Sequence, residues 1–289
     1  MRVALVGAGR MGSAMGIRVA GAGHDLVVFS RTRSRSEDVA RRSAARVADT
    51  ARDAAASAEI CLVSLADDVA VTSTYLEDDG LIAGVQSGAV VCDMSTIAPA
   101  TVRGLAPLVA QKDATLLDTP VSGSVSVVQS GTLTVMVGGD PTALERARPV
   151  LDAFAKSIFH LGDVGAGATM KLVVNSLLHS LNVAVSEALV LAEKAGLDRE
   201  AVYDIFEAGA AGAPYVKYKR AAFLRPGEVP VAFTLDLVAK DQELIHELAE
   251  QVEARMDQAE ASRQLVTKAL EVGMGERDTS EIAEFLRRL

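Results

Sequence analysis

Cysteine is scarce in this 289-residue sequence, which contains only two, and both lie inside short apolar runs. Cys61 lies in EICLVSL and Cys92 in AVVCDMS. Such thiols are typical of buried strands in a reducing compartment, and they argue against a disulfide or a cysteine metal site. The four histidines are scattered without the spacing of metal ligands. The sequence therefore predicts neither a disulfide nor a bound metal.

Basic residues are fewer than acidic residues. The 29 Lys and Arg residues face 38 Asp and Glu residues, which gives a net charge of −9 at pH 7. A nucleic-acid-binding surface needs a basic face, so nucleic acid is not an expected partner. A local cationic pocket could still bind an anionic cofactor or a carboxylate substrate.

Long apolar runs are also missing. None approaches the roughly 20 residues of a membrane span. The N-terminal run Val3–Val6 is too short for the core of a signal peptide. We therefore expect a cytoplasmic protein that binds small molecules and neither nucleic acid nor a membrane.

The first half of the chain alternates short β-type runs with helical segments. The predicted strands are apolar throughout, as in sheets covered on both faces; they are Val3–Val6, Leu26–Phe29, Ile60–Leu65, Val90–Met94, Thr115–Leu117 and Leu133–Val137. The helical segments between them include Met11–Ala22, Arg35–Ala45 and Ala98–Gln111. This alternation predicts an α/β fold with a doubly wound, mostly parallel sheet.

The pattern changes after about Gly162. A helical pattern without proline or glycine runs from Ala168 to Ala195, which is longer than most helices of globular proteins. Further helices are predicted over Arg199–Ala208, Val238–Arg255 with an extension to Ala259, Ser262–Val272 and Glu281–Leu289. We predict two domains, 1–162 and 163–289. The second is all-helical and is joined to the first by the long helix.

A glycine-rich turn follows the first predicted strand and precedes a helix. It reads Gly7-Ala8-Gly9-Arg10-Met11-Gly12. In a dinucleotide cradle the first glycine allows the sharp turn, the second lets the backbone approach a pyrophosphate, and the third permits close helix–strand packing. The helix N-terminus would add free N–H groups and a positive dipole end. We predict that all six residues bind a dinucleotide.

The acid that usually follows the second strand of an NAD-binding domain is missing. The sequence there reads Ser30-Arg31-Thr32-Arg33. A carboxylate would repel a 2′-phosphate, whereas Arg31 would pair with one in forked geometry. The stretch Ser30, Arg31 and Thr32 therefore favours NADP(H), with NAD(H) as the alternative cofactor. Arg31 and Arg33 could also be solvated surface charges.

Four further stretches complete the pattern. They are Asp93-Met94-Ser95-Thr96, Asp118-Thr119-Pro120-Val121-Ser122-Gly123-Ser124, Gly165 to Asn175 with Lys171, and Lys240-Asp241. Together they resemble the β-hydroxyacid dehydrogenase family, which contains 3-hydroxyisobutyrate dehydrogenase, tartronate semialdehyde reductase and similar semialdehyde reductases. The resemblance covers nearly the whole chain in the order and spacing of the family. It implies a Rossmann domain and a helical domain joined by a long interdomain helix, which is shared in homodimers or homotetramers.

The resemblance also implies roles for single residues. Lys171 matches the catalytic lysine and Asn175 the substrate-binding asparagine. Thr96 and Lys240 match cofactor contacts, and Leu65 completes the predicted cofactor-binding set. Ser122, Gly123 and Ser124 match the substrate-binding loop, although Ser124 stands where the family has glycine, so the shape of this loop is open.

Simpler roles for these residues are also open. Lys171 could be a solvated charge and Asn175 a helix-packing amide. Thr96 could cap the helix beginning near Pro99. Lys240 could pair with Glu243 or Asp236 on its own helix. His179, two turns beyond Lys171, could approach the same pocket.

The implied reaction is hydride transfer between a nicotinamide and a short β-hydroxy acid or its semialdehyde. A lysine can donate and accept the proton if burial and a nearby oxidised nicotinamide lower its ammonium pKa. Three alternatives remain. Imine reductases resemble this architecture but typically carry Asp or Tyr in place of Lys171, 6-phosphogluconate-type enzymes are usually longer, and a non-catalytic NADP-binding module would not need Lys171 and Asn175.

Overall fold

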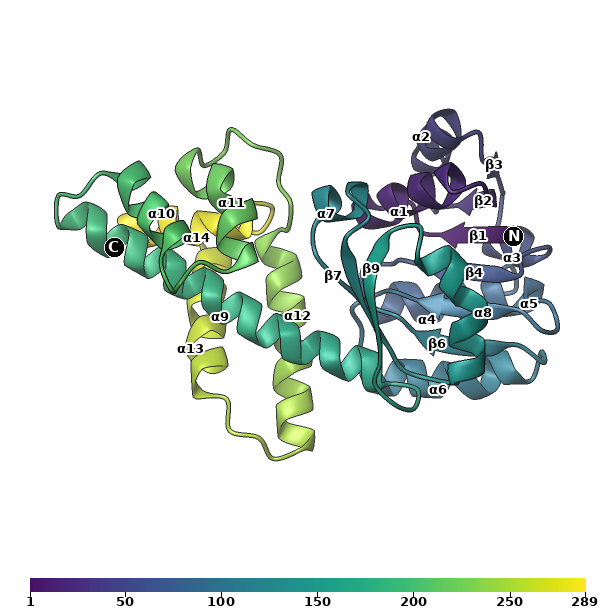
Figure 1. The fold of residues 1–289 in the computed structure, drawn as a ribbon. Coiled ribbons are helices and arrows are strands. Elements are labelled where there is room, and N and C mark those ends of the chain that lie inside the picture. The colour runs from purple at the N-terminus through teal and green to yellow at the C-terminus, as the bar shows by residue number, and fades with distance from the viewer. The chain divides into compact units, whose positions relative to one another are not determined.

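The structure, a computed structural model, describes residues 1–289 (Figure 1). The chain divides into two compact units, Met1–Lys171 and Leu172–Leu289. Helix α9 (Ala166–Lys194) contributes its first turns to the first unit and the rest to the second. The domain boundary expected at 162/163 stays a prediction.

A six-stranded, all-parallel sheet forms the centre of the first unit, in the order β3-β2-β1-β4-β5-β6. The strands are β1 (Arg2–Val6), β2 (Asp25–Phe29), β3 (Arg46–Val47), β4 (Ile60–Val63), β5 (Val90–Asp93) and β6 (Thr115–Asp118). The winding reverses between β1 and β4. Open α/β sheets bind their ligands at such a reversal, outside the carboxyl ends of the strands.

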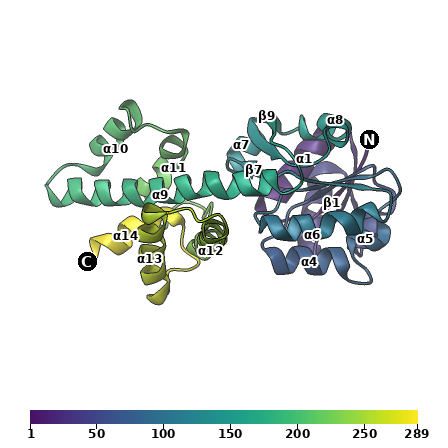
Figure 2. The same ribbon diagram turned by 90° about the horizontal axis from the view of Figure 1, so that it is seen from below.

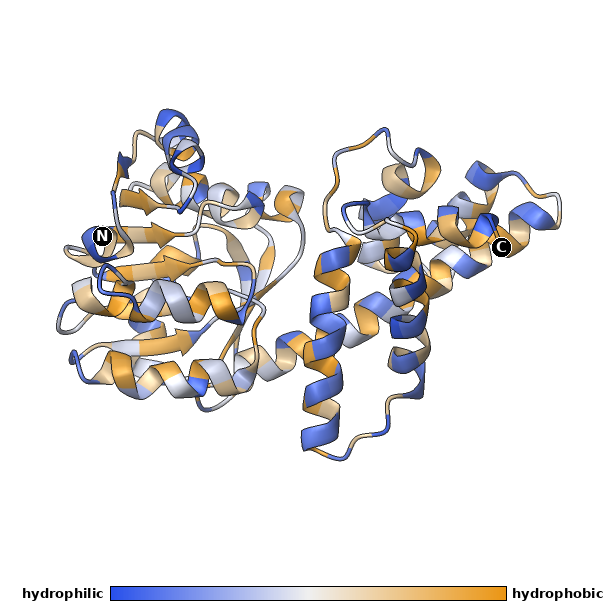
Figure 3. Cartoon of the chain, turned by 180° about the vertical axis from the view of Figure 1, so that it is seen from behind, coloured by the Kyte–Doolittle hydropathy of each residue, from blue (hydrophilic) through white to orange (hydrophobic).

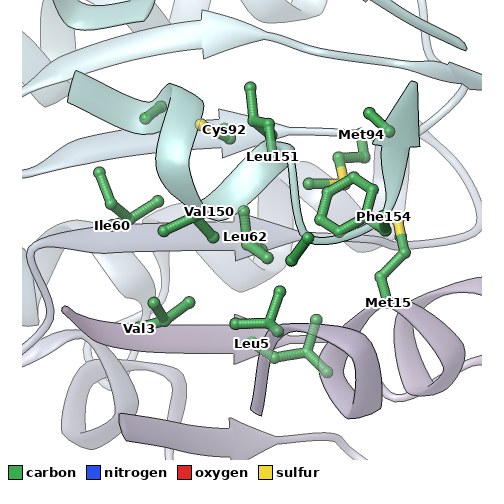
Figure 4. Packing of buried hydrophobic residues seen from close by; sticks show 14 of the residues in the cluster. Val3, Leu5, Met15, Ile60, Leu62, Cys92, Met94, Val150, Leu151 and Phe154 are labelled. Carbon is green, nitrogen blue, oxygen red and sulfur yellow. The ribbon is translucent and has the colours of Figure 1, made fainter. Parts of the chain in front are cut away.

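Helices cover both faces of this sheet, as the apolar strands predicted (Figures 2 and 3). The helices of the unit are α1 (Arg10–Gly21), α2 (Arg33–Ser43), α3 (Ala51–Ala55), α4 (Asp68–Leu76), α5 (Leu81–Gly84), α6 (Pro99–Ala110), α7 (Val125–Gln129) and α8 (Pro141–Leu151). On one face, Leu5 and Leu62 pack with Met15 of α1 and Val150 of α8 (Figure 4). The other face packs against α3, α4, α5 and α6.

Both cysteines lie in this sheet as free, buried thiols. Burial raises the pKa of Cys61 to about 12 and also raises that of Cys92. Neither is therefore a thiolate at neutral pH.

Two strand predictions were wrong in detail. Leu133–Val137 is β8, which lies not in the main sheet but in a second sheet with β7 (Val121–Ser122) and β9 (Ala155–His160). The main sheet takes the two-residue β3 instead, which is too short for a hydrophobic pattern. The strand expected over Ile60–Leu65 ends at Val63, and the Leu65 N–H donates to Ser95 Oγ (3.0 Å).

The second unit is all-helical, as predicted. Its elements after α9 are α10 (Arg199–Ala208), α11 (Pro214–Leu224), α12 (Leu235–Gln251), α13 (Asp257–Glu271), the 3₁₀ turn η1 (Thr279–Glu281) and α14 (Ile282–Arg287). The expected extension of α12 to Ala259 is wrong. Glu253 has a φ of +54°, and the Ala254 N–H donates back to the Ala249 carbonyl (2.9 Å), so the helix ends before α13 begins.

Helix α9 is long and apolar enough to cross a membrane by length and composition alone, contrary to the expectation from uninterrupted apolar runs. This is a weak indication, because core helices of soluble proteins pass the same test. Polar side chains interrupt the apolar sequence of α9 and are buried within the second unit. They are Asn175, His179, Asn182 and Ser186.

Candidate functional site

The glycine turn lies at the β1 end of the sheet reversal, where two of its positions accept only glycine. Gly7 has a φ of +102°, and a Cβ there would lie 2.2 Å from the Ser64 carbonyl oxygen. A Cβ at Gly12 would lie 2.0 Å from the Gly7 carbonyl oxygen. The Gly7 N–H also donates to the Phe29 carbonyl (2.8 Å), which fixes the turn against β2.

The surface above Gly9 fits an anionic group. Gly9 is the N-cap of α1 and supplies no side-chain cap, and the first turn of α1 has no acidic residue. A Cβ at Gly9 would contact no atom within 4 Å, so a phosphate can approach the backbone there. Ala8 is buried, Met11 is half-buried and Arg10 is exposed at the helix start. The turn therefore suits the pyrophosphate of a dinucleotide.

The two arginines after β2 differ in their contacts. Arg33 pairs with Glu37 (3.1 Å) and with Asp49. Arg31 is exposed and forms no ion pair, and it lies between half-buried Ser30 and exposed Thr32. Of the two guanidinium groups, that of Arg31 is the one open to a ligand.

A buried network joins the loops that follow β4 and β5. Asp93 accepts hydrogen bonds from the Ser95 N–H (2.9 Å) and from Tyr75 Oη (2.9 Å). Ser95 in turn accepts the bond from the Leu65 N–H. Burial raises the pKa of Asp93 to about 6, although its hydrogen bonds oppose the shift. Sequence reasoning quoted Asp93 and Ser95 but missed that they fix the backbone of Leu65.

Thr96, the residue after this network, is half-buried. The N-cap of α6 is Ala98, without a side-chain cap, so the capping alternative for Thr96 is wrong. The Ala98 N–H donates instead to Asp68 Oδ1 (3.0 Å).

The loop after β7 contains the predicted substrate-binding residues. Ser122 pairs with Thr134 of β8 and is half-buried. Gly123 has a φ of +140°, and a Cβ there would lie 2.7 Å from Leu133. Ser124 is the N-cap of α7, and its hydroxyl lies 2.8 Å from that of Ser126. Glycine is thus required at 123 but not at 124.

Asp118 fixes the start of α9 in the first unit. Its two carboxylate oxygens accept from the Gly165 N–H (2.8 Å) and the Ala168 N–H (2.7 Å). Ala168 lies three residues before Lys171, which is half-buried. Asp118 was quoted in the sequence motif without a role, because nothing in the sequence links β6 to a helix start some 50 residues later.

In the second unit, a buried carboxylate holds Asn175. The Asn175 Nδ2 amide donates to Asp241 Oδ2 at 2.7 Å, and the two residues are 3% and 1% exposed. Asn175 Oδ1 has no hydrogen-bond partner. Asn175 is four positions after Lys171 on α9, so the two lie on one face of that helix.

Lys240 and His179 also contact Asp241. Lys240 Nζ lies 2.8 Å from Oδ1, so Lys240 pairs with Asp241, a carboxylate that the alternative of a surface ion pair with Glu243 or Asp236 did not include. His179 Nε2 lies 3.6 Å from Oδ2, beyond hydrogen-bond distance, and its ring stacks on Phe233. Burial raises the pKa of Asp241, but His179 and Lys240 outweigh burial and leave it below its usual value.

Two family models cover almost the whole chain. Residues 2–162 match the NAD binding domain of 6-phosphogluconate dehydrogenase. Residues 165–286 match the NAD-binding domain of NADP-dependent 3-hydroxyisobutyrate dehydrogenase. The chain belongs to the β-hydroxyacid dehydrogenase family. It is therefore an oxidoreductase that uses a nicotinamide cofactor.

Characterised members of the family are similar over their full length. The enzyme is 33% identical to the NAD-dependent L-serine dehydrogenase of Pseudomonas aeruginosa, over 97% of this chain and 96% of that protein. It is 31% identical to glyoxylate/succinic semialdehyde reductase 1 of Arabidopsis thaliana, over 99% of both chains. The crystal structure of 3-hydroxyisobutyrate dehydrogenase from Salmonella typhimurium superposes with a TM-score of 0.91 at 25% identity, covering 99% of each chain.

Proposed function

We propose that this dehydrogenase interconverts a short β-hydroxy acid and its semialdehyde, prefers NADP(H), and uses Lys171 as its general acid and base. The placement of Asn175 carries the proposal: Asp241 holds its amide one helical turn beyond Lys171. A lysine and an oriented amide on one helix face suit proton transfer to and from one substrate oxygen. The relatives are named for serine, glyoxylate and succinic semialdehyde, which are small carboxylates or their aldehydes.

The bound nicotinamide supplies the hydride in reduction and accepts it in oxidation. In reduction, the Lys171 ammonium donates its proton to the carbonyl oxygen of the substrate. In oxidation, neutral Lys171 takes the proton of the hydroxyl group. The same group thus serves both directions.

Asn175 can bind both forms of the substrate. Asp241 uses one N–H of the Asn175 amide, which leaves the second N–H and Oδ1. The N–H can donate to a substrate carbonyl, and Oδ1 can accept from a substrate hydroxyl. We assign the substrate carboxylate to Ser122, Gly123 and Ser124, where hydroxyls and backbone N–H groups can bind an anion without a bulky side chain intruding.

The cofactor preference rests on Arg31. Its unpaired guanidinium follows β2, where an acid would favour NAD. We assign the 2′-phosphate of NADP to Arg31 with Ser30 and Thr32. The glycine turn with Leu65, Thr96 and Lys240 completes the proposed cofactor site.

We further propose that the enzyme is a homodimer or homotetramer that pairs through α9. Leu177 and Leu191 are each 73% exposed on this helix, and large apolar side chains so exposed favour association. Size-exclusion chromatography with light scattering tests this directly. A monomer at micromolar concentration would contradict it.

One assay tests the proposed reaction. NADPH oxidation is followed with succinic semialdehyde, methylmalonate semialdehyde, tartronate semialdehyde, glyoxylate and a cyclic imine as parallel acceptors, and repeated with NADH. We expect turnover of at least one semialdehyde or glyoxylate, faster with NADPH. Turnover of the imine alone would assign an imine reductase. Cofactor binding without turnover would leave only an NADP-binding module.

A further inference from the structure

The carboxylate of Asp118, the last residue of β6, is enclosed by distant segments of the first unit. The residue is 1% exposed, and its two oxygens accept the N–H groups of Gly165 and Ala168. Its backbone is bonded to Gly138, the residue after β8. The Gly138 N–H donates to the Asp118 carbonyl (2.9 Å), and the Asp118 N–H donates to the Gly138 carbonyl (3.1 Å). The ends of β6 and β8 and the start of α9 therefore meet at this one residue.

Two glycines leave room for this carboxylate. A Cβ at Gly138 would lie 2.5 Å from Asp118 Oδ1. A Cβ at Gly167 would lie 2.9 Å from Asp118 Oδ2 and 2.7 Å from the Asp118 carbonyl oxygen. Neither glycine has a positive φ, so the backbone conformation does not require glycine at these positions. Close packing around Asp118 does.

The carboxylate caps α9 from outside the helix. The residue before α9 is Gly165, which has no side chain to accept the free N–H groups of the first turn. Asp118 takes that role from a position 47 residues earlier, and the helix dipole stabilises an anion there. Lys171 follows Ala168 by three residues, so the position of its backbone depends on how the start of the helix is held.

Asp118 also begins the segment that leads to the proposed substrate-binding loop. Ser122 lies four positions later and pairs with Thr134 of β8. The same strand ends next to Gly138, which is bonded to Asp118. The loop with Ser122 and the helix start before Lys171 are therefore both anchored at Asp118, within the first unit.

We propose that Asp118 is a positioning residue, which fixes Lys171 at a set distance from Ser122. In a β-hydroxy acid, one carbon separates the carboxylate from the carbon that reacts. The loop that binds the carboxylate and the lysine that donates the proton must therefore be placed with little tolerance, and a misplacement of about 1 Å can cost about 100-fold in rate. The positioning role rests on the proposed function of Lys171 and Ser122, whereas the hydrogen bonds of Asp118 do not.

The variant Asp118→Asn tests the role with a small change. The amide keeps one oxygen acceptor but turns an NH₂ group toward the second backbone N–H, so the start of α9 is no longer held. With the best acceptor from the panel at saturation, we expect kcat to fall about 10- to 100-fold. KM for NADPH should stay within about threefold of wild type, because an interaction needed only in the reacting complex affects kcat.

The matched control is Asp140→Asn. Asp140 caps α8 in the same unit, where its Oδ1 accepts the Ala143 N–H (2.8 Å). This variant also weakens a helix start, but α8 carries none of the proposed site residues. It should leave kcat unchanged.

A double-mutant cycle separates positioning from a general loss of structure. In the Lys171→Ala background, Asp118→Asn should lower the residual kcat by less than about threefold, because residues that act as a unit are not additive. A loss as large as in the wild-type background would overturn the positioning role, and so would wild-type kcat in a folded Asp118→Asn enzyme.

Thermal unfolding with saturating NADPH shows whether each variant is folded, since a ligand stabilises the state that binds it. If Asp118→Asn does not fold, Asp118→Ala takes its place in the cycle, because it puts no NH₂ group against the helix start. Failure of both variants to fold would assign Asp118 to stability alone and would overturn the positioning role.

Amide hydrogen exchange, followed by mass spectrometry, tests the anchoring without any assay. Asp118→Asn should raise exchange in peptides covering residues 165–171, whereas Asp140→Asn should raise it only at the start of α8. Unchanged exchange over 165–171 in Asp118→Asn would overturn the proposal. If the wild-type enzyme reduces none of the acceptors, or Lys171→Ala keeps its kcat, the proposed function fails while the exchange result still stands.

Discussion

The carboxylate of Asp241 and the amide of Asn175 form a hydrogen bond of 2.7 Å between two almost fully buried side chains. The bond joins α12 to α9, two helices that are far apart in the sequence. It also fixes which side of the amide is the NH₂ group, because a carboxylate only accepts. The free oxygen of Asn175 therefore faces away from Asp241.

Removing this carboxylate should affect both binding and stability. We expect Asp241→Ala to lower the free energy of unfolding by about 1–3 kcal/mol, because it leaves the buried Asn175 N–H unsatisfied. It should also raise KM for the acceptor, since Asn175 loses its orientation. Asp236→Ala, near the start of the same helix, is the control for KM. Urea unfolding and steady-state kinetics measure the two effects, and an unchanged KM in a folded Asp241→Ala enzyme would contradict the role of the bond.

The two arginines after β2 should differ in their effect on cofactor use. Arg31→Ala should raise KM for NADPH by about 10- to 100-fold, the scale of a charge-assisted hydrogen bond, and leave KM for NADH nearly unchanged. Arg33→Ala is the matched control and should change neither, because Arg33 is already paired with Glu37 and Asp49. Equal effects of Arg31→Ala on both cofactors would refute the assignment of the 2′-phosphate.

Asp93 should make the enzyme less stable as the pH rises. Its pKa is about 6 in the folded protein against 3.8 for the free side chain, so the folded state binds the proton more tightly. The stabilisation is complete below pH 3.8 and is lost as the pH rises through 6. The loss amounts to about 3 kcal/mol, at 1.36 kcal/mol per pKa unit.

Asp93→Asn should remove this pH dependence, since Asn can keep both bonds, to the Ser95 N–H and to Tyr75 Oη, without a charge. Urea unfolding of wild type and variant from pH 4 to pH 8 measures the difference. The two curves should converge in acid and separate at neutral pH, with the variant more stable. Parallel curves would show that Asp93 does not titrate in this range. Exposed Asp152→Asn serves as the control.

A buried ion pair should contribute to the stability of the second unit. Lys219 Nζ lies 2.6 Å from Asp278 Oδ1, and both residues are 3% exposed. Burial lowers the pKa of Lys219, whereas Lys219 and several hydrogen bonds outweigh burial at Asp278 and lower its pKa. Lys219→Met should cost about 3–5 kcal/mol at neutral pH, because it leaves a buried charge uncompensated.

The cost of Lys219→Met should shrink in acid, where Asp278 takes up a proton. Urea unfolding at pH 5 and pH 7.5 shows this as a smaller difference from wild type at the lower pH. Lys217→Met, an exposed position two residues earlier, should change stability little at either pH. A cost that is the same at both pH values would indicate lost packing and not lost charge pairing.

Most of the fold could be predicted from two properties of the sequence: the periodicity of its hydrophobic residues and the length of its apolar and helical segments. The apolar strands, the glycine turn and the long α9 were predicted to within a few residues. The predictions failed where geometry is set by single backbone contacts. Strand β3 has two residues and no pattern, and α12 ends at Gln251, two residues before Glu253, whose left-handed backbone no glycine marked.

The candidate site was predictable in its motifs but not in its supporting contacts. Lys171, Asn175 and Lys240 were singled out by the resemblance of their motifs to the family, and their roles stay predictions. Asp118 and Asp241 hold the helix start and the amide, but each acts on residues 47 or more positions away, so no local pattern links them. The one feature of the sequence that could have pointed to these two contacts is that each motif contains a carboxylate, Asp118 or Asp241.

The rate of NADPH-dependent reduction by Lys171→Ala tests the central claim most directly. With the best acceptor at saturation, we expect kcat to fall by about 10²- to 10⁴-fold, the usual contribution of a general acid. Lys194→Ala, at the far end of the same helix, should retain wild-type kcat. A folded Lys171→Ala enzyme that keeps kcat within a few-fold of wild type would contradict the assignment of Lys171 as the general acid and base.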